Sequence, residues 1–279
     1  MPDKLDYEDY NEPKCPACND TYVRNEDRPI YRVPMDRVTQ KLDEYFFGRD
    51  FEGAERHLSY WLAEARAGRD KGAELSLIGE FMGFYRQRGR RDEAYAKAEE
   101  GLRLAEEYGY GGSLTGGTIC LNAATVYKAF GDAEKAVGLY DNAREVYETY
   151  LEKGDRRLGG LYNNMGLALT DCGRYGEAEE CYKKAIEVME SAPDGGLEAA
   201  ISCLNMADEI TLRLGEIESE SEVEALLGKA KDLLEKENSR TDGYYAYVCE
   251  SCASVYGYYG YFLYEKELRE RAKKIYERA

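Results

Sequence analysis

Two pairs of cysteines have the C-x-x-C spacing that can bind zinc or exchange disulfides. Cys15 and Cys18 lie near the start of the chain, and Cys249 and Cys252 lie near its end. Four thiolates would complete a tetrahedral zinc site. Cys252, however, falls at a core position of an expected helix, where cysteine packs as a small apolar residue, and a redox motif of this kind follows a strand in a βαβ pattern. We therefore expect no metal and no cofactor, and the role of the Cys15–Cys18 pair stays open.

A second kind of chemistry would depend on histidine. The chain has one histidine, His57, so a Ser-His or Cys-His mechanism would have to use this residue. The sequence contains no phosphate-binding loop, no His-acid pair and no metal-ligand spacing, and its carboxylates are scattered over helix faces. These features favour a protein that is not an enzyme.

The charge of the chain limits its partners. Asp and Glu number 55 against 38 Lys and Arg, which gives a net charge of −17 over 279 residues. Nucleic acid and anionic membranes would both be repelled, so neither is expected as the main partner. The acidic first residues do not form a signal peptide, and the apolar runs are too short to span a bilayer. Eight cysteines do not form a secreted disulfide framework, so a cytoplasmic location is expected.

The elements that position these residues repeat along the chain. Glycines occur at intervals of 41 to 45 residues, at positions 48, 89, 131, 173, 215 and 260. A small residue follows five positions after each of the first four, at Gly53, Ala94, Ala136 and Ala178. In the fifth unit Val223 comes eight positions after Gly215, so we expect three extra residues in an acidic loop. A fixed period of this length indicates a repeat architecture.

Each unit is expected to form two helices, as the fourth unit shows most clearly. Leu161, Met165 and Leu169 make an apolar stripe, Gly173 ends the helix at a position that tolerates positive φ, and Tyr182 lies on the next stripe. Small residues in both helices would let their axes approach, with the tyrosine filling the space between them. Because one pair cannot bury its apolar sides alone, the pairs must stack.

The motif of this unit resembles the tetratricopeptide repeat (TPR). Tyr162-x₂-Met165-Gly166-x₂-Leu169 is followed by Ala178-x₃-Tyr182 and then Ala185. The usual tryptophan is missing, and the longer period is similar to the repeats of kinesin light chain and bacterial peptide-pheromone receptors. The resemblance implies an all-α, right-handed α-α superhelix of about six helix pairs over residues 36–279, after an irregular N-terminal extension, residues 1–35. A HEAT-type or other α-solenoid is the alternative.

The resemblance also implies a peptide-binding groove. One position of the first helix, which faces the concave groove in the TPR family, is occupied by Glu80, Asn122, Asn164 and Asn205. A carboxamide can pair with both the C=O and the N–H of an extended peptide. The alternative is that these asparagines only bond an adjacent helix.

Other residues are expected in the same groove. They are Arg86, Lys128, Asn163, Thr125 and Asp208, together with five tyrosines at 244, 247, 258, 259 and 261. The two cations would receive a ligand carboxylate, or would simply be solvated, and the tyrosines would line the groove or fill space between helices. The carboxylate clamp of chaperone-binding TPR domains is not reproduced. We therefore expect a non-catalytic scaffold that binds a protein or peptide segment; a homo-oligomer whose groove or terminal units pack on another copy is the alternative.

Overall fold

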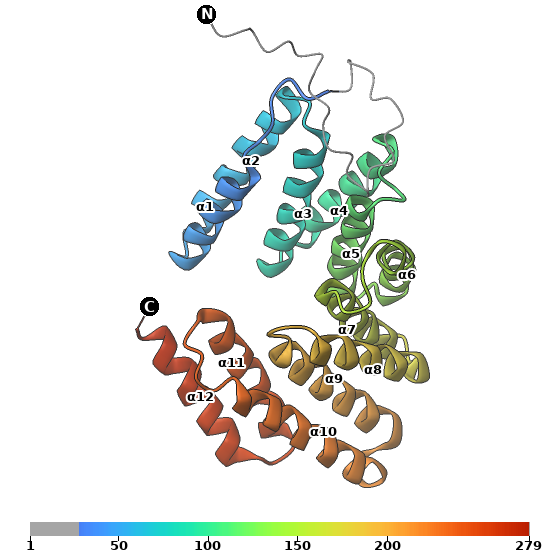
Figure 1. Ribbon diagram of the computed structural model, residues 1–279, viewed down its shortest axis with the longest axis vertical. Coiled ribbons are helices and arrows are strands. Elements are labelled where there is room, and N and C mark those ends of the chain that lie inside the picture. The colour runs from blue at the N-terminus through green and yellow to red at the C-terminus, as the bar shows by residue number, and fades with distance from the viewer. Residues whose placement is uncertain (1–27, 279) are drawn as a thin grey trace, which may run out of the picture. The chain divides into compact units, whose positions relative to one another are not determined.

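The computed structural model describes residues 28–278, which form twelve α-helices joined by short turns, with no strand among them (Figure 1). The helices are α1 Met35–Phe47, α2 Phe51–Ala67, α3 Lys71–Gln87, α4 Arg91–Glu107, α5 Leu114–Ala129, α6 Ala133–Tyr150, α7 Arg156–Asp171, α8 Tyr175–Ser191, α9 Gly196–Leu214, α10 Glu216–Lys236, α11 Gly243–Tyr258 and α12 Phe262–Tyr276. The predicted all-α fold of about six helix pairs is confirmed. Cys15, Cys18 and most of the expected extension lie outside the described residues.

Contacts divide the chain into two units, with the boundary inside α3 after Leu77. The described part of the first unit comprises α1, α2 and the first turns of α3. Its core includes Leu42, Leu58 and Leu62. The Asp70 carboxylate caps α3 by accepting from the Ala73 N–H (3.1 Å) and also accepts from the N–H of Val33 (2.9 Å), so it ties the segment before α1 to the start of α3.

The second unit, residues 78–279, is a series of stacked helix pairs. The pair α7–α8 shows how they pack: a Cβ added to Gly166 would lie 2.7 Å from the ring of Tyr182, which is fully buried. Only a residue without a side chain lets the ring approach this closely. The interpretation that small residues bring the helices together around a tyrosine is therefore confirmed.

The repeated glycines end the first helix of each pair as predicted. Gly89, Gly131, Gly173, Gly215 and Gly260 all have φ between 68° and 92°, a region that L-residues with a Cβ rarely occupy. The first unit differs, because Gly48 has φ −74° and the left-handed position falls one residue later, at Arg49.

The prediction of an acidic loop in the fifth helix pair is wrong. Gly215 is followed directly by α10, whose 21 residues exceed the 17 of α8. The additional residues therefore extend the helix at its start. Glutamate suits this position, because carboxylates in the first turn interact favourably with the helix dipole. None of the helices formed by the described residues is both long and apolar enough to cross a membrane.

Candidate functional site

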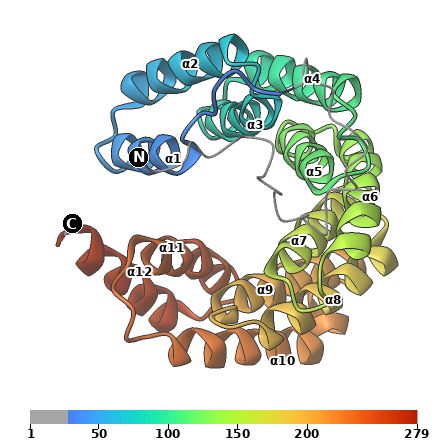
Figure 2. The ribbon, with the colours of Figure 1, turned by 45° about the horizontal axis from the view of Figure 1, so that its top comes forward.

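The inner helices of the second unit carry the surface that the resemblance assigns to ligands. Figure 2 shows α5, α7, α9 and α11 on the inner side of this unit and α6, α8 and α10 on its outer side. We define the inner face by these polar side chains, which are all half-buried except the exposed Asp171: Asn122, Thr125, Lys128, Asn163, Asn164, Asp171, Asn205, Asp208, Thr211 and Tyr259.

Polar bonds link each inner helix to the next. Between α5 and α7, Lys128 Nζ lies 3.6 Å from Asp171 Oδ2. Between α7 and α9, Asn205 Nδ2 donates to Asn163 Oδ1 (2.9 Å), which also accepts from the hydroxyl of Ser202. These bonds bring Asn163 and Asn205 together, and Lys128 close to Asp171, and they also use part of the bonding capacity that a ligand would need.

The predicted asparagine column is therefore not uniform. Asn205 bonds the adjacent helix, as the alternative interpretation proposed. The side chain of Asn164 makes no hydrogen bond to any residue between 28 and 278. Asn122 packs against α3, since its Nδ2 lies 2.9 Å from the point where a Gly79 Cβ would stand. Glu80 is half-buried on α3. The carboxamides of Asn122 and Asn164 thus make no hydrogen bond to a residue that the structure describes, and of the two Asn164 lies on the more central inner helix, α7.

Thr125 bonds an outer helix, whereas Arg86 has no ion-pair partner among the described residues. The Thr125 hydroxyl lies 3.1 Å from the hydroxyl of Tyr140 on α6, and burial raises the pKa of Tyr140 to about 12. Thr170 and Tyr182 form the same kind of pair (3.3 Å). Thr125 therefore ties an inner helix to an outer one, a role that the sequence reasoning missed. Arg86 is half-buried and forms no ion pair with a described residue.

A pocket of about 390 Å³ lies where α9 and α10 meet the end of α11. We call it the junction pocket, and define it by its lining residues: Thr211, Glu216, Ser219, Glu220, Val223, Glu224, Leu227, Tyr258, Tyr259, Gly260 and Tyr261. Ser219, Val223 and Leu227 are buried, whereas the glutamates are exposed. The pocket combines carboxylates with aromatic rings, and no lysine or arginine lines it.

Tyr259 connects the junction pocket to the inner face. Its hydroxyl donates to Asp208 Oδ1 (3.0 Å) and lies 2.9 Å from the hydroxyl of Thr211. Asp208 is half-buried and forms no ion pair with any residue that the structure describes. Burial raises the pKa of Asp208, and the bond from Tyr259 offsets this effect in part. The predicted groove residue Asp208 thus lies beside a pocket that the sequence did not reveal.

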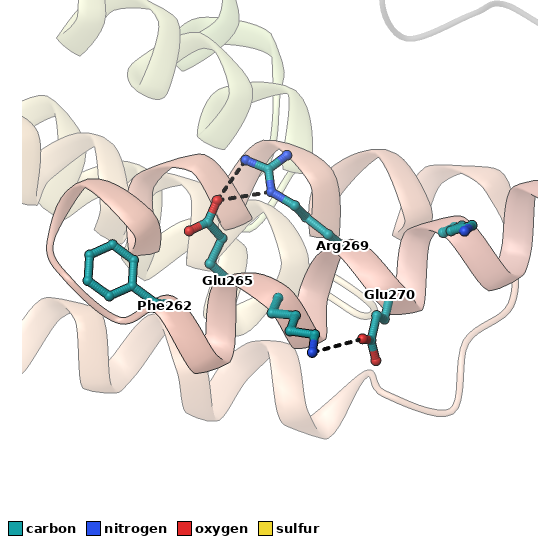
Figure 3. Close-up of a pocket in the computed structure, with 6 residues that line it drawn as sticks. Phe262, Glu265, Arg269 and Glu270 are labelled. Carbon is teal, nitrogen blue, oxygen red and sulfur yellow. Dashed lines mark hydrogen bonds and ion pairs between the residues drawn. The ribbon is translucent and has the colours of Figure 1, made fainter.

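The exposed surface of α12 carries a different hollow, of about 260 Å³ (Figure 3). Phe262 lies at one end of it and is 68% exposed. The charged side chains pair with one another: Arg269 lies 2.9 Å from Glu265, and Lys266 lies 3.9 Å from Glu270. Each carboxylate here already has a cation, in contrast to the junction pocket.

Cys249, Cys252 and His57 are held by packing and hydrogen bonds within the fold. Cys249 and Cys252 are buried free thiols, and burial raises both pKa values, that of Cys252 to about 12. His57 Nε2 donates to the Val38 carbonyl (3.0 Å) within the first unit. Across residues 28–278, no group of three or more His, Cys, Asp or Glu side chains is arranged to hold a metal ion.

The comparisons with known proteins agree with this architecture. Residues 161–191, which include most of α7 and all of α8, match the family model of the tetratricopeptide repeat. The chain contains a tetratricopeptide repeat. This is the segment from which the sequence motif was drawn, and its recognition is confirmed. No curated protein sequence matches the chain.

Solved structures extend the TPR-like fold over most of the chain. BtubC (BKLC) from P. vanneervenii is 21% identical, with a TM-score of 0.64 over 74% of this chain and 82% of that one. TPR-like repeats of a kinesin light chain from Podosopora anserina are 15% identical, with a TM-score of 0.59 over 74% of this chain and 97% of that one. MamA is 15% identical, with a TM-score of 0.50 over 76% of this chain and 100% of that one. At these identities the likeness shows the fold alone.

Proposed function

We propose that this protein is a non-catalytic cytoplasmic scaffold whose inner face binds an extended peptide or a segment of a partner protein. TPR-like solenoids present a continuous surface built from successive repeats, and such surfaces suit extended partners. The carboxamides come from Asn122, Asn164 and Asn205, with Asn163 beside them. Arg86 on α3 and Lys128 on α5, which also lies near Asp171, supply cations, and Asp208 on α9 supplies a carboxylate. Glu80 and Thr125 complete the predicted set.

The observation that carries the proposal is the state of Asn164. Its carboxamide is half-buried on the central inner helix, yet makes no hydrogen bond to a described residue. When a polar group that is partly removed from water acquires a hydrogen-bond partner, its free energy falls. The C=O and N–H of an extended backbone would satisfy its donor and acceptor together.

The test combines identification of the partner with one matched pair of variants. The protein is used to recover a partner from a lysate of its source, and the affinity of that partner is then measured for the parent, Asn164→Ala and Asn142→Ala. Asn142 is an exposed asparagine of the outer helix α6. We expect roughly ten-fold weaker binding for Asn164→Ala, since leaving ligand amides unpaired costs about 1–3 kcal/mol, and no change for Asn142→Ala.

The outcomes separate the proposal from its alternative. Equal affinities of the parent and Asn164→Ala would remove the carboxamide from the binding surface. If light scattering instead shows a stable dimer and the inner face captures nothing, self-assembly through the groove or the terminal units replaces peptide binding.

A further inference from the structure

The junction pocket differs in charge from three other hollows of the second unit. The hollow on α12 includes Lys266, Arg269 and Lys273, that between α8 and α10 includes Lys183 and Lys229, and that between α6 and α8 includes Lys153 and Lys184. The junction pocket has three glutamates and no cation among its lining residues. Its negative charge is therefore not neutralised from within its own walls.

Cations near the pocket are already paired elsewhere. Arg213, two residues after Thr211, lies 3.0 Å from Glu209 and 2.9 Å from Glu179. Lys229, on α10, lies 3.0 Å from Glu190. Within residues 28–278, Glu216, Glu220 and Glu224 form no ion pair. No residue that the structure describes therefore supplies a positive charge to these three glutamates.

The opposite wall of the pocket is aromatic. Tyr258 is 66% exposed and Tyr261 is 40% exposed, and the Tyr258 ring stands edge-on to that of Tyr259, with centroids 5.0 Å apart. Aromatic faces attract ammonium and guanidinium groups, most strongly where the cation is partly desolvated. Carboxylates on one wall and tyrosine rings on the other are complementary to a lysine or arginine side chain.

The spacing of the glutamates argues against a single metal ion. Positions 216, 220 and 224 lie one helical turn apart on one side of α10, so the row extends over about 12 Å at 1.5 Å per residue. Ligands of one divalent cation must converge within about 2–3 Å of it. The row suits instead an elongated group, or successive cationic side chains.

We propose that the junction pocket binds a lysine or arginine side chain of the segment that lies on the inner face. This inference rests on the proposed function. Tyr259 supplies the connection, because it lines the pocket and also donates to Asp208 on the inner face. An extended segment running along α7 and α9 would therefore place a basic residue between α10 and Tyr258.

The test uses a defined probe in place of the unknown partner. The probe is a fluorescein-labelled Gly-Ser decapeptide with two adjacent arginines, and a peptide with citrulline at both positions keeps the shape without the charge. Binding is followed by fluorescence anisotropy at about 50 mM salt, where ionic attraction is weakly screened. We expect saturable binding of the arginine peptide, at least ten-fold tighter than that of the citrulline peptide.

Two triple variants with the same change in net charge locate the site. The first variant removes the charge of the pocket by combining Glu216→Gln, Glu220→Gln and Glu224→Gln. We expect it to bind the arginine peptide at least ten-fold more weakly than the parent. The matched control replaces three exposed glutamates that lie outside the pocket and form no ion pair with a described residue: Glu180→Gln, Glu218→Gln and Glu222→Gln. We expect less than three-fold weakening for this control.

The aromatic wall is tested by Tyr258→Phe and Tyr258→Ala. Phenylalanine keeps the ring face, so Tyr258→Phe should bind within two-fold of the parent, whereas Tyr258→Ala should bind several-fold more weakly. Because Tyr258 is largely exposed, both variants should fold as the parent does, which circular dichroism checks.

Three results would overturn the inference. One is the absence of saturable binding of the arginine peptide up to about 1 mM, the weak end of specific affinities. Another is an equal loss in the two triple variants, which would indicate attraction by net charge alone. The third is spermidine competing at the concentration of the peptide, which would indicate a polyamine site. In each case an effect of Asn164→Ala on the recovered partner leaves the proposed function standing, so the two proposals fail separately.

Discussion

Asp208 and Glu235 are two half-buried carboxylates with opposite electrostatic surroundings. Each accepts a hydrogen bond from a tyrosine hydroxyl: Tyr259 donates to Asp208 (3.0 Å) and Tyr264 donates to Glu235 (2.7 Å). Glu235 also lies 2.9 Å from the guanidinium of Arg271, whereas Asp208 has no cation among the described residues.

The pKa values follow this difference. Burial raises the pKa of Asp208, and one hydroxyl does not compensate. Burial acts in the same direction on Glu235, but the bonds from Arg271 and Tyr264 outweigh it and hold its pKa below the usual range. The comparison teaches that the effect of burial on a carboxylate depends on its partners: the folded protein favours the charged form of Glu235, which has a cation beside it, and disfavours that of Asp208, which has none among the described residues.

Removing the cation beside Glu235 should have the largest effect. Arg271 is only 17% exposed and also donates to the hydroxyl of Tyr245 (3.1 Å). Arg271→Ala should lower the free energy of unfolding by about 2–3 kcal/mol, because it leaves a half-buried carboxylate without its cation. Urea denaturation measures the loss. Arg269→Ala on the same helix, which breaks an exposed pair with Glu265, should cost under about 0.5 kcal/mol; equal losses would contradict the comparison.

Neutralising the two carboxylates should give effects of opposite sign. At pH 7, Glu235→Gln should be about 1–2 kcal/mol less stable than the parent, and Asp208→Asn about 0.5 kcal/mol more stable. The lowered pKa of Glu235 means that its contribution is present above its unfolded pKa and is lost as the pH falls through the folded value.

The raised pKa of Asp208 has the opposite consequence. This destabilising effect is present above the folded pKa and disappears as the pH falls below the unfolded pKa of about 4. Both variants should therefore converge with the parent in acid. Thermal melts between pH 3 and pH 7 measure both trends, and a destabilised Asp208→Asn at pH 7 would show that the charge of Asp208 supports the fold.

The smallest effect concerns the asparagine column. Asn205→Ala breaks the bond to Asn163 and should lower stability by about 0.5–1 kcal/mol. Asn164→Ala removes no bond within the described structure and should change stability by less than about 0.3 kcal/mol. Differential scanning calorimetry on both variants distinguishes a uniform column from a divided one, since equal shifts would contradict the difference seen here.

The sequence by itself determined the repeat. Glycines that tolerate positive φ and small residues at fixed offsets constrain the chain locally, within one helix pair, so their spacing predicts the helices and their ends. One local prediction was wrong: the acidic insert after Gly215 forms the first turns of α10, because glutamates are compatible with either a loop or a helix start. Gly48 follows the end of α1, but the left-handed position there is Arg49, which the spacing alone did not indicate.

Tertiary structure decided which charged and polar groups remain available. Arg213 pairs with Glu179 across 34 residues, and Asn205 bonds Asn163 across 42. No local pattern shows whether a side chain has such a partner, because the partner arrives only when successive pairs stack. The junction pocket has the same origin: Glu220 and Tyr258 are far apart in sequence and meet only where α10 packs near the end of α11. Helix formation is a local property of the chain, whereas the compensation of charge depends on long-range contacts.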